Sequence, residues 1–168
     1  MASAALLAAL EFGHIISAMS WLGGGILTTF VLGPSLRELP PPAALQFNAK
    51  VLPRLLRFIQ MAVGATLLFG VLLLYFYYNG DFSQLSATTE GIELSTGILL
   101  AVATGVVAWT VTLPSFKKVA QIAGEIIKSG AQQPPPELMV YGRRARIGAT
   151  VGVILLLVVL AMMVAAGY

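Results

Sequence analysis

Cysteine is absent from this chain of 168 residues, and histidine occurs only once. The lack of cysteine excludes disulfides, thiolate metal sites and thiol catalysis. Charged residues are also scarce, at 10% of the sequence, where a typical soluble domain has about 25%. The sequence contains no HExxH motif, no phosphate-binding glycine loop and no basic stretch interleaved with aromatic residues. These absences argue against hydrolytic or nucleotide-driven chemistry and against binding to nucleic acid.

Hydrophobic residues make up 58% of the chain, which is more than a protein of this size can bury in a water-soluble core. Four apolar stretches reach the roughly 20 residues that a helix needs to cross a bilayer. They cover residues 6–32, 56–78, 92–113 and 147–168. The sequence therefore predicts an all-α integral membrane protein, folded as a single membrane domain in a four-transmembrane-helix antiparallel bundle.

The basic residues are confined to two parts of the chain. All ten Lys and Arg fall within 37–57 and 117–146, whereas the connection between the second and third spans has acidic residues and no basic one. By the positive-inside rule, both basic loops are cytoplasmic and the N- and C-termini lie outside the cytoplasmic membrane. Tyrosines then lie at the outer ends of the second and fourth spans, as in an aromatic belt: Tyr75, Tyr77, Tyr78 and Tyr168.

The two halves of the sequence resemble each other. Residues 31–35 (VLGPS) parallel 111–115 (VTLPS), Gly-Ala-Thr occurs at 64–66 and at 148–150, and each basic loop has a triple proline. These matches indicate a duplicated two-helix hairpin, with an axis along the membrane normal relating the halves. The alternative is chance, because apolar sequence of low complexity repeats easily.

Residues 116–128 have the pattern of an amphipathic helix, with one apolar face made of Phe116, Val119, Ile122, Ala123 and Ile126. This helix either lies in the inner headgroup region or extends the third span past Pro114. Its apolar face serves as an anchor or as a docking surface for a partner. Small residues at four-residue spacing predict close helix packing, or close approach of a cofactor or a second protein, at Gly97-Ala101-Gly105 and at Gly148 and Gly152.

His14 is at the centre of the main polar group within a span. Glu11 lies one turn before it, and further residues of the same helical face are Ser17, Trp21, Gly24, Gly25 and Thr28. An ionisable residue in a span suggests function, and histidine is a frequent ligand of metals and haem. About 20 residues counted from Leu32 reach Gly13, which puts His14 just inside the outer boundary. A wet histidine paired with Glu11 at headgroup level is the alternative.

Two methionines complete the candidate set. Met19 is one turn deeper than His14, and Met162 lies at a comparable depth in the fourth span. Thioethers suit Cu(I), and a methionine opposite a histidine is also a haem pairing. The alternative is that both are ordinary apolar filling.

The first span resembles the first helix of a group of small membrane proteins that includes the CopD-type copper-resistance proteins. The shared pattern is a histidine (His14), a tryptophan seven residues on (Trp21), a glycine pair (Gly23 and Gly24) and a proline at the inner end (Pro34). It is more distantly similar to the HemJ-type protoporphyrinogen oxidases, in which the first-helix histidine binds haem b. The resemblance implies a metal or haem role for His14.

Two hypotheses follow. In the first, the protein handles haem b or copper through His14, with Glu11 orienting the imidazole and Trp21 packed beside it. In the second, it is a non-catalytic accessory subunit of a respiratory or oxidase-type membrane complex, with the glycine faces and the amphipathic helix as contacts. Partners are the lipid bilayer and either other membrane proteins or a second copy of the chain. The absence of Lys, Arg, Asp or Glu at the centre of any span counts against an ion-coupled transporter.

Overall fold

The computed structural model describes residues 3–131 and 133–167, so the position predicted for Tyr168 lies outside the described residues. Every regular element in these residues is helical. The elements are α1 (Ala4–Ile26), η1 (Leu27–Leu32), α2 (Gly33–Glu38), α3 (Pro41–Lys50), α4 (Leu52–Tyr78), α5 (Gln84–Ala87), α6 (Thr89–Val107), η2 (Ala108–Thr112), α7 (Leu113–Ser129) and α8 (Pro136–Ala165).

Four continuous helical segments are long and apolar enough to cross a membrane. They are Ala4–Glu38, Leu52–Tyr78, Thr89–Ser129 and Pro136–Ala165. The first three contain the predicted spans 6–32, 56–78 and 92–113 in full, and the fourth contains the predicted span from residue 147 to Ala165. Each helix also continues beyond its span at the end that has the basic residues. The protein is therefore an all-α, four-helix membrane protein, as the sequence predicts.

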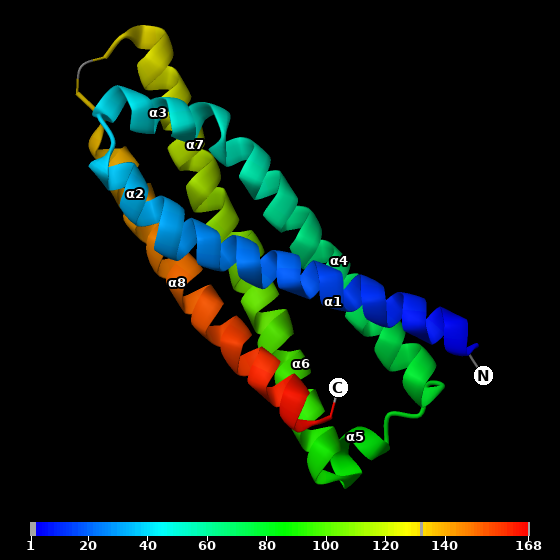
Figure 1. Cartoon of the computed structure of the whole chain (residues 1–168). Coiled ribbons are helices and arrows are strands. Elements are labelled where there is room, and N and C mark those ends of the chain that lie inside the picture. Colours follow the sequence, from blue (N-terminus) through cyan, green and yellow to red (C-terminus); the bar gives the residue numbers. More distant parts are fainter. Residues whose placement is uncertain (1–2, 132, 168) are drawn as a thin grey trace.

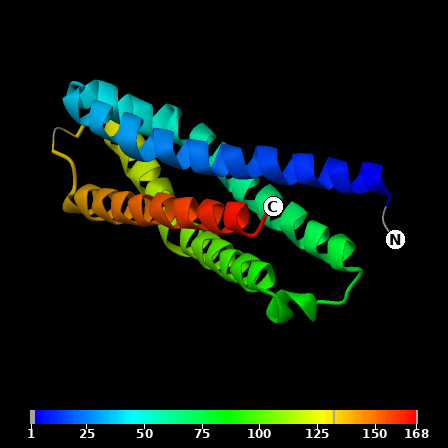
Figure 2. The same ribbon diagram turned by 60° about the horizontal axis from the view of Figure 1, so that its bottom comes forward.

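The four long helices form two antiparallel hairpins. α1 packs along α4, and α6 packs along α8. Figure 1 shows α2, α3, the end of α7 and the start of α8 gathered at one end of the molecule, whereas the two termini and α5 lie toward the opposite end. The same division is visible in Figure 2. We call these the basic end and the terminal end, because all ten Lys and Arg fall in or near the elements at the former.

Residues with special backbone properties mark the helix boundaries. Prolines occupy the first turn of α3, α4 and α8, where a missing N–H costs no intrahelical bond. α4 is followed by Asn79 and α7 by Gly130, and both of these capping residues have the left-handed conformation. At the start of α6, the Thr88 hydroxyl accepts a hydrogen bond from the backbone N–H of Gly91 at 3.0 Å.

The first and third long helices contain a π-helical segment at the same place in the predicted repeat. η1 precedes Pro34 and η2 precedes Pro114. A proline ring clashes with the carbonyl four residues earlier and lacks the N–H to bond it. The wider i to i+5 pattern relieves both problems without ending the helix. The two halves thus share a structural irregularity as well as the sequence matches.

The structure decides between the two placements of the amphipathic helix. α7 continues directly from η2 through Pro114, so it extends the third long helix. Its apolar face packs against α3, α4 and α8 within the chain. The buried members of that face include Val119, Ile122, Ala123 and Ile126. The chain itself therefore covers most of this face.

Two helical parts of the basic end lie outside the predicted spans. α3 forms in the first basic loop, started by Pro41 and Pro42, and α8 begins at Pro136, well before residue 147. The apolar core here consists of Leu52, Leu56, Leu113, Val119 and Ala120. This core explains both additions, because α3 and the start of α8 pack on α7.

Candidate ligand site at His14

The predicted polar face of the first helix is its buried face. The buried residues of α1 and η1 are Leu10, Ser17, Trp21, Gly24 and Thr28, and His14 itself is half-buried on the same side. Trp21 is 5% exposed and belongs to a core cluster with residues of α4 and α8. The helical periodicity of the sequence thus identified the side of α1 that faces the protein.

His14 is bound to the neighbouring helix of its hairpin. Its Nδ1 lies 3.0 Å from the backbone carbonyl oxygen of Thr66 in α4. A carbonyl oxygen can only accept, so Nδ1 is the donor and bears the proton. The bond joins two helices inside the apolar layer, where a polar group without a partner is costly. It therefore fixes both the orientation of the ring and its protonated nitrogen.

Glycines make room for this contact. A Cβ atom added at Gly70 would lie 3.1 Å from His14 Cε1 and 3.3 Å from Nδ1, closer than side chains normally approach. A Cβ atom added at Gly13 would lie 2.8 Å from the ring of Phe69. Each helix thus has a glycine opposite an aromatic ring of the other. The two notches allow α1 and α4 to approach near the terminal end.

The hydrogen bond leaves the second ring nitrogen available. With the proton on Nδ1, Nε2 has a free lone pair. No residue in the described part of the chain forms a hydrogen bond with Nε2. A histidine that ligates a metal nearly always donates its other N–H to a carboxylate, a backbone carbonyl or water. The His14 imidazole therefore has the tautomer and the support that a ligand through Nε2 requires.

The predicted partners of His14 take other positions. Glu11 is exposed and forms no described hydrogen bond with the imidazole, so the carbonyl of Thr66 orients the ring in place of this carboxylate. Ser17 donates its hydroxyl to the carbonyls of Gly13 and His14, at 2.7 and 3.0 Å. Its hydroxyl proton is thus used within α1.

The two methionines lie on different surfaces. Met19 is 65% exposed and belongs to the outward face of α1. Met162 is half-buried in α8, and its Cβ would lie 3.3 Å from a Cβ added at Gly97 of α6. Its described contact is thus with the second hairpin, whereas those of His14 are with α4. Among residues 3–131 and 133–167, no three His, Asp or Glu side chains are grouped to hold a metal.

The small-residue motifs pack within the bundle. Gly97 faces Met162 and Met163, and an added Cβ at Gly105 would lie 3.0 Å from Leu67 of α4. At Gly148 it would lie 2.5 Å from the Thr112 hydroxyl oxygen. Only Gly152 of the predicted set has open space around it. Gly97, Gly105 and Gly148 therefore pack against other helices of the chain, whereas Gly152 does not.

Thr66 and Gly70 are the site residues that sequence reasoning missed. Thr66 belongs to the repeated Gly-Ala-Thr, but its contribution is a backbone carbonyl, for which side-chain identity gives no signal. Gly70 lies one helical turn after Thr66, on the same face of α4. Its lack of a side chain is the sequence feature that indicates a close approach of α1 at this level. His14 and Gly70 both lie toward the outer ends of their predicted spans, so their similar depth in the membrane could have suggested this contact.

Together, the fold and the site define a four-helix membrane protein with a single histidine held between the helices of its first hairpin. No protein-family model, curated protein or solved structure matches the chain. The resemblance to CopD-type and HemJ-type proteins therefore rests on the residues of the first helix.

Proposed function

We propose that this protein binds haem b through Nε2 of His14 and acts in electron transfer or haem handling near the outer face of the membrane. The observation that supports this proposal is the bond from Nδ1 of His14 to the carbonyl of Thr66, at 3.0 Å. It is the support expected of a ligating histidine. The resemblance of the first helix to haem- and copper-handling proteins points the same way.

Haem is favoured over copper by the number of ligands that the chain offers. The porphyrin supplies four nitrogens to its iron, so one histidine is a sufficient protein ligand. Copper needs several protein ligands, and thioethers would be the natural additions. Met19 faces outward and Met162 packs on α6, so neither has a described contact with His14. Copper is therefore the second candidate.

The chain's own residues would hold and orient the haem. Nε2 of His14 would hold the iron, the carbonyl of Thr66 would keep the imidazole in the Nδ1-protonated form, and Gly70 would leave space for the imidazole. The iron would supply the one-electron chemistry when bound. The apolar surroundings of the site favour a haem over an exposed small ion.

The test is a reduced-minus-oxidised visible spectrum of protein purified gently from its native membrane. We expect a b-type signal stoichiometric with the chain, and its loss in His14→Ala. Glu11→Gln is the matched control, because this exposed side chain is one turn away and should leave the spectrum unchanged. Free imidazole added to His14→Gly should restore the Soret band.

A featureless spectrum of a folded wild-type protein would overturn the haem proposal. Elemental analysis for copper would then test the second candidate. If both are negative and other membrane proteins co-purify in fixed stoichiometry, the accessory-subunit hypothesis is favoured.

A further inference from the structure

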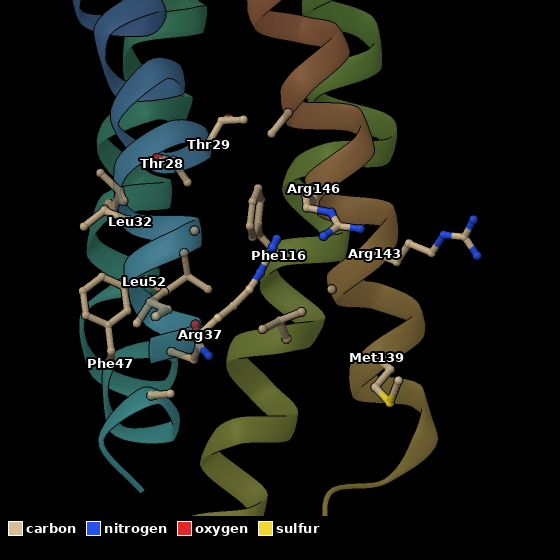
Figure 3. Close-up of a pocket in the computed structure, with 18 of the residues that line it drawn as sticks. Thr28, Thr29, Leu32, Arg37, Phe47, Leu52, Phe116, Met139, Arg143 and Arg146 are labelled. Carbon is tan, nitrogen blue, oxygen red and sulfur yellow. The ribbon is translucent and has the colours of Figure 1, made fainter. Parts of the chain in front are cut away.

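A groove opens at the basic end of the molecule. It has a volume of about 860 Å³, within the range of roughly 300–1,000 Å³ typical of ligand sites. Residues of η1, α2, α3, α4, α7 and α8 line it. Figure 3 shows it between the first long helix on one side and α7 and α8 on the other. His14, Thr66 and Gly70 do not line this groove.

The charge of the groove has one sign. Its lining includes Arg37, Arg143 and Arg146, and no Asp or Glu. In Figure 3, Arg37 from α2 and Arg146 from α8 extend toward the same space beside Phe116. The structure describes no ion pair for any of these arginines within residues 3–131 and 133–167. Two guanidinium groups that converge without a carboxylate favour an anion between them.

The rest of the groove is apolar and extends toward the membrane interior. Thr29 lines it eight residues before Arg37, which is about 12 Å along a helix. Apolar residues dominate the wall, among them Leu32, Val140 and Ala149. The Thr29 hydroxyl oxygen is buried and has no hydrogen-bond partner in the structure.

We propose that this groove binds one anionic phospholipid of the surrounding leaflet. The phosphodiester would lie between Arg37 and Arg146, and an acyl chain would follow the apolar wall toward Thr29. Basic pockets between transmembrane helices bind anionic headgroups in this way. The charge complementarity selects an anion, and the apolar wall selects one that has a hydrocarbon chain. A lipid reaches the groove directly from the bilayer.

Native mass spectrometry of the purified full-length protein tests the proposal. The protein in detergent is offered equal amounts of dioleoylphosphatidylglycerol and dioleoylphosphatidylcholine. We expect one phosphatidylglycerol per chain to bind in preference. In Arg37→Gln/Arg146→Gln, its apparent affinity should fall roughly tenfold or more, because both phosphate contacts are lost. The control is Lys118→Gln/Arg144→Gln, which removes equal charge from α7 and α8 outside the groove and should keep the preference.

A second variant tests the role of the apolar wall of the groove. Ala149 lies in the apolar part of the groove, one turn after Arg146. Ala149→Phe would fill this part without changing the charge, so it should reduce phosphatidylglycerol retention. Inorganic phosphate at millimolar concentration should not displace the lipid. Equal binding of both lipids, equal loss in the two charge variants, or displacement by phosphate would each overturn the proposal; the last would indicate a site for free anions. None of these outcomes depends on whether His14 binds haem.

Discussion

At the scale of single residues, the position of one imidazole proton determines what His14 can do. The carbonyl of Thr66 holds that proton on Nδ1. The other ring nitrogen, Nε2, therefore keeps a lone pair with which it can bind a metal. Were the proton on Nε2, the ring could not ligate a metal through that atom without first losing it. The hydrogen bond that joins α1 to α4 therefore also leaves Nε2 able to bind a ligand.

This arrangement predicts the effect of a side chain at Gly70. In Gly70→Val, the new methyl groups would occupy the space of the His14 ring, since even a Cβ atom would lie 3.1 Å from Cε1. We expect the ring to be displaced and the Nδ1–H to Thr66 bond to be lost. Nitrogen-15 NMR of labelled histidine in bicelles measures this directly. The wild-type spectrum should show the Nδ1-protonated tautomer, and the variant should show a mixture.

The matched control for this prediction is Gly64→Ala in the same helix. A Cβ atom there would lie 3.7 Å from Trp109 Cζ2, which is ordinary contact. Its histidine spectrum should equal that of the wild type. A Gly70→Val spectrum unchanged from the wild type would show that the ring does not depend on the glycine notch.

Sequence reasoning located His14 but not the atom that holds it. The spacing from Glu11 suggested a carboxylate within the same helix, and that carboxylate is exposed. The true acceptor is a backbone carbonyl 52 residues away. Every residue has such a carbonyl, so only the packing of α1 on α4, with its glycine notches, selects this one.

At the scale of whole elements, α8 contains two glycines whose alanine variants allow the effect of packing to be distinguished from that of helix propensity. A Cβ atom at Gly148 would meet the side chain of Thr112 in η2, whereas Gly152, one turn later, has nothing within 4 Å. Threonine is stiff about χ1, so it cannot easily turn aside. We expect Gly148→Ala to destabilise the protein by about 1–3 kcal/mol, as overpacked sites do.

Gly152→Ala is expected to act in the opposite direction. Alanine in a helix is favoured over glycine by up to about 1 kcal/mol, and here no contact opposes it. Thermal unfolding of both variants in one detergent, followed by circular dichroism, compares them. If Gly148→Ala were as stable as Gly152→Ala, the close contact of α8 with η2 would be wrong.

The elements were predictable where lipid alone dictates them. Residue composition placed the four spans, because about 20 apolar residues are needed to cross the bilayer. The helices at the basic end were not predictable in the same way. α3 and the first turns of α8 have mixed composition, and they are held by packing on α7. The π-helical segments also have no sequence signal beyond the prolines that follow them.

At the scale of the whole molecule, the two candidate sites lie at opposite ends. His14 lies toward the terminal end, where it is hydrogen-bonded to Thr66, and the arginine-lined groove opens at the basic end. The sequence identified the arginines only as a topology signal. It contains nothing that pairs Arg37 with Arg146, which are brought together by the packing of the first helix near α8.

Orientation in the membrane decides which compartment each site faces. The positive-inside rule predicts that the basic end is cytoplasmic; in that orientation His14 would lie near the outer face and the groove in the inner leaflet. Because the chain has no cysteine, single-cysteine labelling is free of background. Ser83→Cys reports the terminal end and Ser129→Cys the basic end, and both positions are exposed.

In intact cells, a membrane-impermeant maleimide should label Ser83→Cys and should label Ser129→Cys only after permeabilisation. The reverse pattern would place the basic end outside. The groove would then face the outer leaflet, and His14 would lie toward the cytoplasm, where a haem would exchange electrons with cytoplasmic donors. Labelling of both positions in intact cells would be incompatible with this arrangement, because the third span lies between them and places them on opposite sides of the membrane. The experiment thus tests the architecture together with its orientation.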